Sequence, residues 1–351
     1  MAEPDGVTYG DAGVDLDAAE ESVRLISRRV AATHGPEVIG GIGGFGGLFR
    51  FDASAWRDPV LVSSSDGVGT KVELARRTDR LDGLGADLVG MVVDDLVAVG
   101  ARPLFLNDYL AVGRLDPERV ARIVGGIADA CVVTGCALVG GETAEHPGLL
   151  EEDAFDVAGF GVGVVERDAI LGPERVQEGD VLIGLPSSGP HANGYSLIRR
   201  LVAGLDLTDD HGLPRPLVDE LLEPTRLHTP DVLAVLDAVG VAGLHAACHV
   251  TGGGIPGNLP RVLPDGSVAH VDTASWGMPP IFRWLAARGP VLDDELWRTF
   301  NCGVGMVLVV GVEQQADALD TLAARDVDAW VMGTVATGAG GGPAQVQLPA
   351  D

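Results

Sequence analysis

The chain has 351 residues, 46% of them hydrophobic and 21% charged, which is enough for about two domains with buried cores. Its 24 basic and 51 acidic residues give a net charge of −27, and a surface this acidic disfavours binding to nucleic acids and anionic membranes. No apolar run approaches the ~18 residues of a membrane-spanning helix, and the first residues lack a signal-peptide pattern. We therefore expect a soluble cytoplasmic protein whose four cysteines are free thiols.

Hydrophobic periodicity predicts alternating helices and strands along the chain. In the first half, helices are expected over 18–32, 84–99 and 117–133, and strands over 59–63, 103–112, 137–139 and 156–166. In the second half, strands are expected over 180–185, 244–249, 303–310 and 329–333, with helices near 193–202, 217–222, 230–239, 252–263, 280–287 and 314–324. A turn at Gly172 and Pro173 places the expected boundary between domains 1–171 and 172–345. The fold class is therefore α/β or α+β.

The glycine run from Gly40 to Gly47 is a candidate phosphate-binding loop. Backbone N–H groups in such a run can surround an anion. The run does not match the P-loop pattern, and it lacks the strand–loop–helix setting of a dinucleotide fingerprint. Two interpretations stay open, an anion-binding or lid loop and a purely structural glycine hairpin.

A single lysine, Lys71, stands among 23 arginines. It ends the segment Asp66-Gly67-Val68-Gly69-Thr70-Lys71, between a predicted strand and a helix. A compact ammonium can serve as a point charge on phosphate, and the Asp66 carboxylate is a hard oxygen ligand suited to Mg²⁺. The pattern indicates a phosphate site, although an ordinary turn with a helix cap would look the same.

Carboxylates interrupt several apolar segments of the first half. Asp94 and Asp95 lie in an apolar predicted helix, Asp108 breaks a predicted strand, and Glu142 follows another. Because burying an unpaired carboxylate costs free energy, we expect one of Asp94 and Asp95 to face solvent or a salt bridge while the other points into a site. Together these positions indicate a site for a metal–nucleotide complex, although each alone has a structural explanation.

Two segments of the second half follow predicted strands. The first, 187–196, contains His191, the best candidate for acid–base catalysis by its ordinary pKa. The second, 249–254, has the strand–glycine–helix layout of a phosphate cradle. His245 and His249 would lie in a strand, which makes them a poor zinc pair.

Taken in chain order, these segments resemble the phosphoribosylformylglycinamidine cyclo-ligase family, whose members are also called aminoimidazole ribonucleotide synthetases. The matching segments are 11–15, 36–47, 66–71, 95–97, 103–109, 138–145, 156–159, 188–197, 249–254 and 298–306.

The resemblance implies an ATP-dependent ligase of purine biosynthesis that closes the imidazole ring of aminoimidazole ribonucleotide. ATP would phosphorylate the formamide oxygen of formylglycinamidine ribonucleotide, an amidine nitrogen would attack that carbon, and phosphate would leave. The implied cofactors are Mg²⁺ with ATP as co-substrate, and K⁺ as a candidate activator. The implied assembly is a homodimer in which the N-terminal domain contributes strands to a barrel shared by two protomers, followed by a C-terminal mixed-sheet α/β domain.

The resemblance also implies roles for individual residues. The metal would be held by Asp66, Asp95 and Glu142. The catalytic residues would be His191, Lys71 and Asp66. ATP and phosphate would be bound by Gly41, Gly43, Gly44, Gly46, Gly67, Gly69, Thr70 and Lys71. The substrate would be bound by Ser188, His191, Asn193, Thr251, Gly252 and Gly253.

The chain departs from the family pattern at Gly10, Asp94, Asn107, His146 and Leu149, which leaves a diverged substrate open. One alternative is another ATP-dependent enzyme of the same superfamily, such as a thiamine-monophosphate kinase. Selenophosphate synthetase is disfavoured because the first cysteine here is Cys131. A second alternative is a non-catalytic nucleotide-binding subunit.

Overall fold

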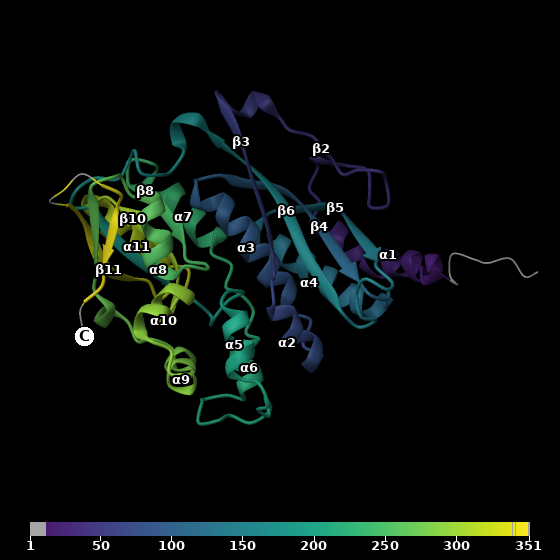
Figure 1. Cartoon of the computed structure of the whole chain (residues 1–351). Helices are drawn as coiled ribbons and strands as arrows, with labels where there is room; N and C mark the ends of the chain where they lie inside the picture. Colours follow the sequence, from purple (N-terminus) through teal and green to yellow (C-terminus); the bar gives the residue numbers. More distant parts are fainter. Residues whose placement is uncertain (1–11, 339, 341, 350–351) are drawn as a thin grey trace, which may run out of the picture.

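The computed structural model describes residues 12–338, 340 and 342–349, so the departure at Gly10 and the first matching residue, Asp11, lie outside the described residues. Its strands form two larger sheets, one in each half of the chain, and a small hairpin (Figure 1). The expectation of a mixed α/β fold is confirmed. Within the described part of the chain, no helix is long and apolar enough to cross a membrane.

The first half contains a four-stranded sheet in the order β3-β6-β4-β5. Its strands are β3 (Pro59–Gly67), β4 (Arg102–Val112), β5 (Ala137–Glu145) and β6 (Phe155–Glu166). β6 pairs antiparallel with both β3 and β4, whereas β4 and β5 are parallel. One face is covered by helices, while the other leaves Leu61, Tyr109 and Phe160 exposed.

Helices of the first half are amphipathic or apolar, and their apolar residues form one core with the sheet. They are α1 (Leu16–Ala31), α2 (Lys71–Thr78), α3 (Leu84–Ala98) and α4 (Pro117–Thr134). The Asp116 side chain caps the start of α4 by accepting a hydrogen bond from the Arg119 N–H at 3.0 Å. The hairpin consists of β1 (Val38–Ile39) and β2 (Leu48–Phe49), which pair antiparallel around the glycine run.

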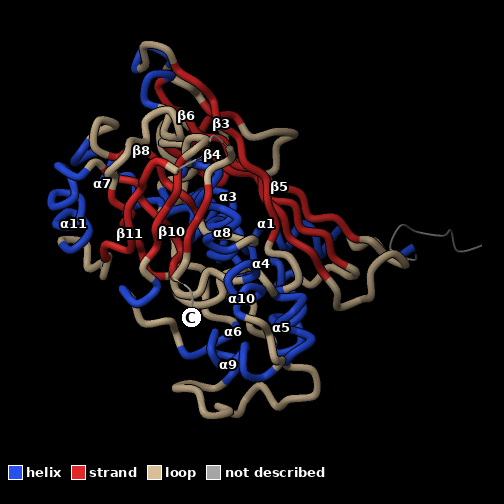
Figure 2. Tube along the Cα trace, turned by 60° about the vertical axis from the view of Figure 1, so that its left-hand side comes forward, coloured by secondary structure: helices blue, strands red, loops and turns tan. Residues whose placement is uncertain are grey.

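The second half contains a six-stranded mixed sheet in the order β12-β9-β11-β7-β10-β8. Its strands are β7 (Val181–Pro186), β8 (Leu244–His249), β9 (Ser267–Val271), β10 (Val304–Val310), β11 (Trp330–Thr337) and β12 (Gln345–Gln347). Its helices are α5 (Tyr195–Leu201), α6 (Leu217–Leu221), α7 (Thr229–Val239), α8 (Gly254–Asn258), α9 (Pro280–Arg288), α10 (Asp293–Thr299) and α11 (Gln315–Ala323). Helices α5, α6, α9 and α10 gather at the foot of the view in Figure 2, around an apolar cluster of their own.

α3 lies between the two halves, near the centre of Figure 1. It packs against β3 and β6 on one side and against α7 and β8 on the other. Most of its residues are buried, which agrees with its nearly continuous apolar sequence. The side chains of α3 therefore contribute to both cores, and its polar residues lie where the halves meet.

Most predicted elements are present, with shifted ends. The strands expected at 59–63 and 137–139 continue to Gly67 and Glu145, because main-chain pairing with β6 and β4 holds residues whose side chains are polar or absent. The strands β1, β2, β9 and β12 and the helix α10 lie outside the predicted elements. The predicted domain boundary falls between the two sheets, in the segment from 167 to 180, and stays a prediction.

Gly85 allows α3 and α4 to cross closely, since a Cβ atom there would lie 2.0 Å from the carbonyl carbon of Gly126. We expect Gly85→Ala to lower the free energy of unfolding by about 3 kcal/mol, because the helices must separate to admit the methyl group. Urea unfolding followed by circular dichroism measures this loss. The control is Gly257→Ala, where no described atom lies within 4 Å of the added Cβ. Equal stability of the two variants would contradict the close crossing.

Asp108 of β4 is 7% exposed, and its carboxylate lies against Gly141 of β5, where a Cβ would be 2.2 Å from Asp108 Oδ1. Burial raises the pKa of Asp108 to about 7. In the unfolded chain the same group titrates near 3.9, so the folded protein binds more protons between about pH 4 and pH 7. Stability therefore falls as the pH rises through this window, because the unfolded chain releases the proton that the fold keeps on Asp108.

We expect Asp108→Asn to remove this pH-dependent loss. Relative to the unsubstituted protein, the variant should gain stability as the pH is raised from 5 to 8, by at most about 4 kcal/mol. Thermal unfolding midpoints at several pH values measure the difference. The exposed Asp265→Asn serves as the control and should show a constant difference. A constant difference for Asp108→Asn would show that this carboxyl is ionised in the fold throughout.

Candidate active site

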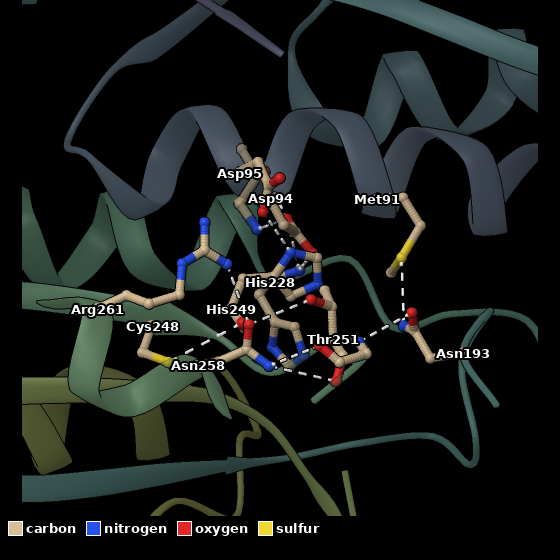
Figure 3. Close-up of polar contacts among 12 residues, drawn as sticks. Met91, Asp94, Asp95, Asn193, His228, Cys248, His249, Thr251, Asn258 and Arg261 are labelled. Carbon is tan, nitrogen blue, oxygen red and sulfur yellow. Dashed lines mark hydrogen bonds and ion pairs between the residues drawn. The ribbon is translucent and has the colours of Figure 1, made fainter. Parts of the chain in front are cut away.

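Adjacent aspartates on α3 point to different surroundings (Figure 3). Asp94 is fully buried, and its carboxylate accepts hydrogen bonds from the N–H groups of His228 at 3.0 Å and Thr229 at 2.8 Å and from the Thr229 hydroxyl at 2.7 Å. The side chain of Asp95 is 47% exposed, and its Oδ1 lies 2.9 Å from His249 Nδ1. The expected division is present, but Asp94 binds the start of α7 and does not add a carboxylate to the open site.

Asp66, Asp95 and His249 form an electrostatic cluster where the two halves meet. We call the exposed surface around Asp66 and Asp95 the opening. Partial burial raises the pKa of Asp66, the nearby Asp95 raises it further, and His249 opposes the shift. Burial opposes a charge on His249, yet its bond to Asp95 and the charges of Asp94 and Asp66 raise its pKa overall. The Nε2 atom of His249 is buried without a partner among the described residues. The cluster therefore offers two carboxylates and one imidazole to a bound ligand.

The glycine turn after β8 is held by amide side chains (Figure 3). Asn258 Nδ2 donates to the carbonyls of Gly254 at 2.9 Å and of Thr251 and Gly252 at 3.3 Å. Asn193 Oδ1 accepts from the Gly252 N–H at 3.0 Å. The predicted substrate residues Asn193, Thr251 and Gly252 thus come together, and Gly253 adopts the left-handed conformation, φ 107°, within the same turn.

Ser188 and His191 lie in the loop between β7 and α5. The Ser188 N–H donates to His191 Nε2 at 3.2 Å, while the Ser188 hydroxyl donates to the Pro224 carbonyl at 2.6 Å. Because Nε2 accepts a hydrogen bond, neutral His191 carries its proton on Nδ1. Burial lowers the pKa of His191 well below its usual value, and the positive charges of His249, Lys71 and Arg226 add to the shift. The ring is fully buried, so its predicted role in proton transfer stays a prediction.

His228 was not predicted, and it lies beside His191 with the ring centroids 5.9 Å apart. It is fully buried, and neither of its ring nitrogens has a partner in the described part of the chain. Burial lowers its pKa well below the usual value. The sequence gives no local signal for this contact, because His228 and His191 are brought together by separate loops.

Lys71 does not lie in the open site. Its side chain is 1% exposed, and Nζ donates to Asp87 Oδ1 at 2.7 Å and to the carbonyls of His191 at 2.8 Å and Glu223 at 2.9 Å. These acceptors use all three ammonium protons. The prediction that Lys71 contacts phosphate therefore does not fit this geometry, since no proton is left for a phosphate oxygen.

Asp66, Gly69 and Thr70 of the same turn are exposed, whereas Val68 is buried in the first-half core. The Gly67 N–H donates to Asp66 Oδ1 at 2.7 Å, and Gly69 is exposed with a φ of 65°. Thr70 precedes α2 but makes no side-chain cap; its hydroxyl lies 3.3 Å from that of Ser196 in α5. The turn therefore reaches across to the second half instead of only starting a helix.

The glycine run and Glu142 lie elsewhere, around a cavity of about 580 Å³. Its lining includes Gly41, Gly43, Gly44, Gly46, Asp108 and Glu142. Asp66 and Glu142 lie on β3 and β5, three strand spacings of about 4.8 Å apart. Accordingly, the described residues contain no group of three His, Cys, Asp or Glu side chains placed to hold one metal ion. Asp66 and Asp95 approach each other, but Glu142 does not join them within one protomer.

Comparisons with known proteins agree with this arrangement of two halves. Residues 51–165 match the N-terminal domain of the AIR synthase related protein family, and residues 177–343 match its C-terminal domain. A phosphoribosylformylglycinamidine cyclo-ligase of Myxococcus xanthus is 51% identical over 340 residues, covering 95% of this chain and 97% of the relative. One from Anaeromyxobacter dehalogenans is 49% identical over 338 residues, covering 95% and 97%.

Solved structures with lower identity share the fold. A thiamine-monophosphate kinase from Stenotrophomonas maltophilia has a TM-score of 0.67 at 22% identity, covering 92% of this chain and 95% of the other. The hydrogenase maturation protein HypE in complex with ATP has a TM-score of 0.65 at 19% identity, covering 93% and 91%. Because identity is high over nearly the whole length of the curated relatives, this chain belongs to the phosphoribosylformylglycinamidine cyclo-ligase family.

Proposed function

We propose that this protein is an ATP-dependent cyclo-ligase that converts formylglycinamidine ribonucleotide to aminoimidazole ribonucleotide in cytoplasmic purine biosynthesis. The observation that carries the proposal is the 51% identity to a curated cyclo-ligase over 95% of the chain. The opening between the halves suits this reaction, because phosphoryl transfer depends mainly on positioning and on neutralising charge.

We assign Asp66 and Asp95 as the protein ligands of a Mg²⁺ ion that binds with ATP. The residues fit such an ion: both side chains are exposed, and Asp95 disfavours the charge of Asp66 in its absence. Mg²⁺ is commonly held by one or two carboxylates together with substrate phosphates. When bound, the ion would neutralise charge on the phosphates. Glu142 would serve the nucleotide from the cavity under the glycine run, away from these two ligands.

The reaction follows from these positions in two steps. The formamide oxygen attacks the γ-phosphorus of ATP, the bond to the bridging oxygen breaks, and ADP leaves. An amidine nitrogen then bonds to the activated carbon, loses a proton, and releases phosphate as the ring closes. In the first step Asp66 and Asp95 orient the nucleotide. In the second, the proton must pass to a group beside the substrate, for which His249 and His191 are the candidates.

The substrate would lie along the Asn193–Gly252 contact, at the edge of the glycine turn. Arg261 donates to Asn258 Oδ1 at 3.2 Å and is exposed, which places a cation near the turn for a ribose phosphate. K⁺ remains a candidate activator. The alternative of a thiamine-monophosphate kinase is supported by the fold alone, at 22% identity.

Purified protein with ATP, Mg²⁺ and formylglycinamidine ribonucleotide should release ADP and form aminoimidazole ribonucleotide in equal amounts. We expect Asp95→Asn to reduce kcat by about 100-fold and to raise the Mg²⁺ concentration needed for half-maximal rate, because one carboxylate ligand is lost. A coupled ADP assay and the colorimetric amine assay measure both products. The exposed Asp320→Asn on α11 is the control. If the unsubstituted protein releases ADP only with thiamine monophosphate, the cyclo-ligase assignment is wrong.

We also propose that two copies join through the open face of the four-stranded sheet. Leu61, Tyr109 and Phe160 are 63%, 44% and 45% exposed there, on three different strands. β3 and β5 form the edges of the sheet, and closing two such sheets into a barrel would pair those edges. A second copy therefore accounts for both the apolar face and the open edges.

Phe160→Glu should convert the homodimer to a monomer, because it places a carboxylate in the apolar contact between copies. Size-exclusion chromatography with light scattering measures the mass. Leu292→Glu is the control, since Leu292 is 76% exposed on the other half of the chain. A monomeric mass for the unsubstituted protein would exclude this interface.

A further inference from the structure

The lone lysine makes contacts that belong to both halves of the molecule. Lys71 begins α2 in the first half, and its ammonium bonds to Asp87 of α3 in the same half. Its other two acceptors, the carbonyls of His191 and Glu223, belong to the second half. The ring of Tyr195 covers the ammonium, with Nζ 5.5 Å from the ring centroid. One buried cation thus joins four segments.

His191 is the acceptor with an unusual backbone. Its φ of 57° lies in the left-handed region, which is unfavourable for a residue with a Cβ. Such a conformation persists only where the surroundings fix it. The Lys71 bond to the His191 carbonyl and the Ser188 N–H bond to the His191 ring together fix both the main chain and the side chain of this residue.

We propose that Lys71 is a positioning residue for ring closure: its ammonium sets the backbone of His191 and thereby holds the 187–195 loop against the substrate site. This inference rests on the proposed function for its kinetic readout. The loop bears Ser188 and Asn193, and Asn193 in turn bonds to the Gly252 N–H of the glycine turn. A shift at His191 would therefore displace the contact on which the substrate is expected to lie.

A simpler role would be charge compensation of Asp87. Asp87 Oδ1 also accepts from the Thr225 N–H at 2.9 Å and hydroxyl at 2.7 Å, so it has partners without the lysine. Two of the three ammonium protons go to neutral carbonyls, which compensation would not require. An arginine could not form the same three contacts. Its guanidinium group is planar, and it cannot direct three donors from one atom to three converging acceptors.

The test separates these roles with Lys71→Met and the double variant Lys71→Met/Asp87→Asn. The double variant leaves no unpaired buried charge, and the amide oxygen introduced at 87 can still accept from Thr225. We expect Lys71→Met to lower the unfolding temperature, and the double variant to recover most of that loss. In both, kcat should fall about 100-fold while the KM for ATP changes less than twofold, because the loop moves but Asp66 and Asp95 do not.

Hydrogen exchange provides a readout that does not need turnover. In both variants, exchange of the Ser188 and Asn193 amides should rise at least tenfold, whereas amides of β10 should keep their protection. Arg77→Met is the control, since Arg77 lies on the same helix in an exposed ion pair with Glu73.

Recovery of kcat and of loop protection in the double variant would overturn the proposal, and would assign Lys71 to charge compensation alone. Unchanged loop protection in Lys71→Met would overturn it as well. If the unsubstituted protein fails to close the ring, the proposed function fails, whereas the exchange result still decides whether Lys71 positions the loop.

Discussion

Two buried aspartates on α3 hold the halves of this protein together. Asp87 and Asp94 are seven residues apart, which places them on one face of the helix two turns from each other. Each accepts main-chain and hydroxyl donors from the second half, Asp87 from Thr225 and Asp94 from His228 and Thr229. Because a buried carboxylate is costly without such donors, segment 225–229 has few other positions it can occupy. The opening that carries Asp66, Asp95 and His249 has its shape fixed by this docking.

This strongly acidic protein must still present a site to anionic ligands. The net charge is −27, and the nearest open carboxylates, Asp66 and Asp95, add to the negative field. The lone lysine cannot offset it from inside the protein, since its protons are already bonded. Attraction of ATP and a ribonucleotide must then come from a bound metal ion, from Arg261 near the glycine turn and from backbone N–H groups. The global charge thus says little about the local field.

The sequence predicted the ends of elements well where the spacing of apolar residues determines them. It predicted them less well where main-chain pairing between strands determines them. Strand β10 follows an apolar run and β8 a mostly apolar one, and both were predicted with nearly correct ends. β3 and β5 run on through Ser64, Asp66 and Gly141, which pattern alone assigns to turns. The split between Asp94 and Asp95 was predictable, because adjacent helical residues cannot both face one core. Asp87 and His228 were missed, because Thr225 lies 138 positions from Asp87 and His191 belongs to a separate loop from His228.

For Lys71, the expectation of close contact with oxygen atoms was correct, but the expected acceptor was not. A compact ammonium at the end of a flexible stem was expected to meet oxygen atoms at close range, and it does. The oxygens, however, belong to Asp87 and two carbonyls of the chain. From the local segment Asp66–Lys71 a phosphate is the simplest acceptor, because the competing acceptors are contributed by residues 16, 120 and 152 positions away. Lys71 is therefore better understood as part of the scaffold that carries the site than as part of its surface.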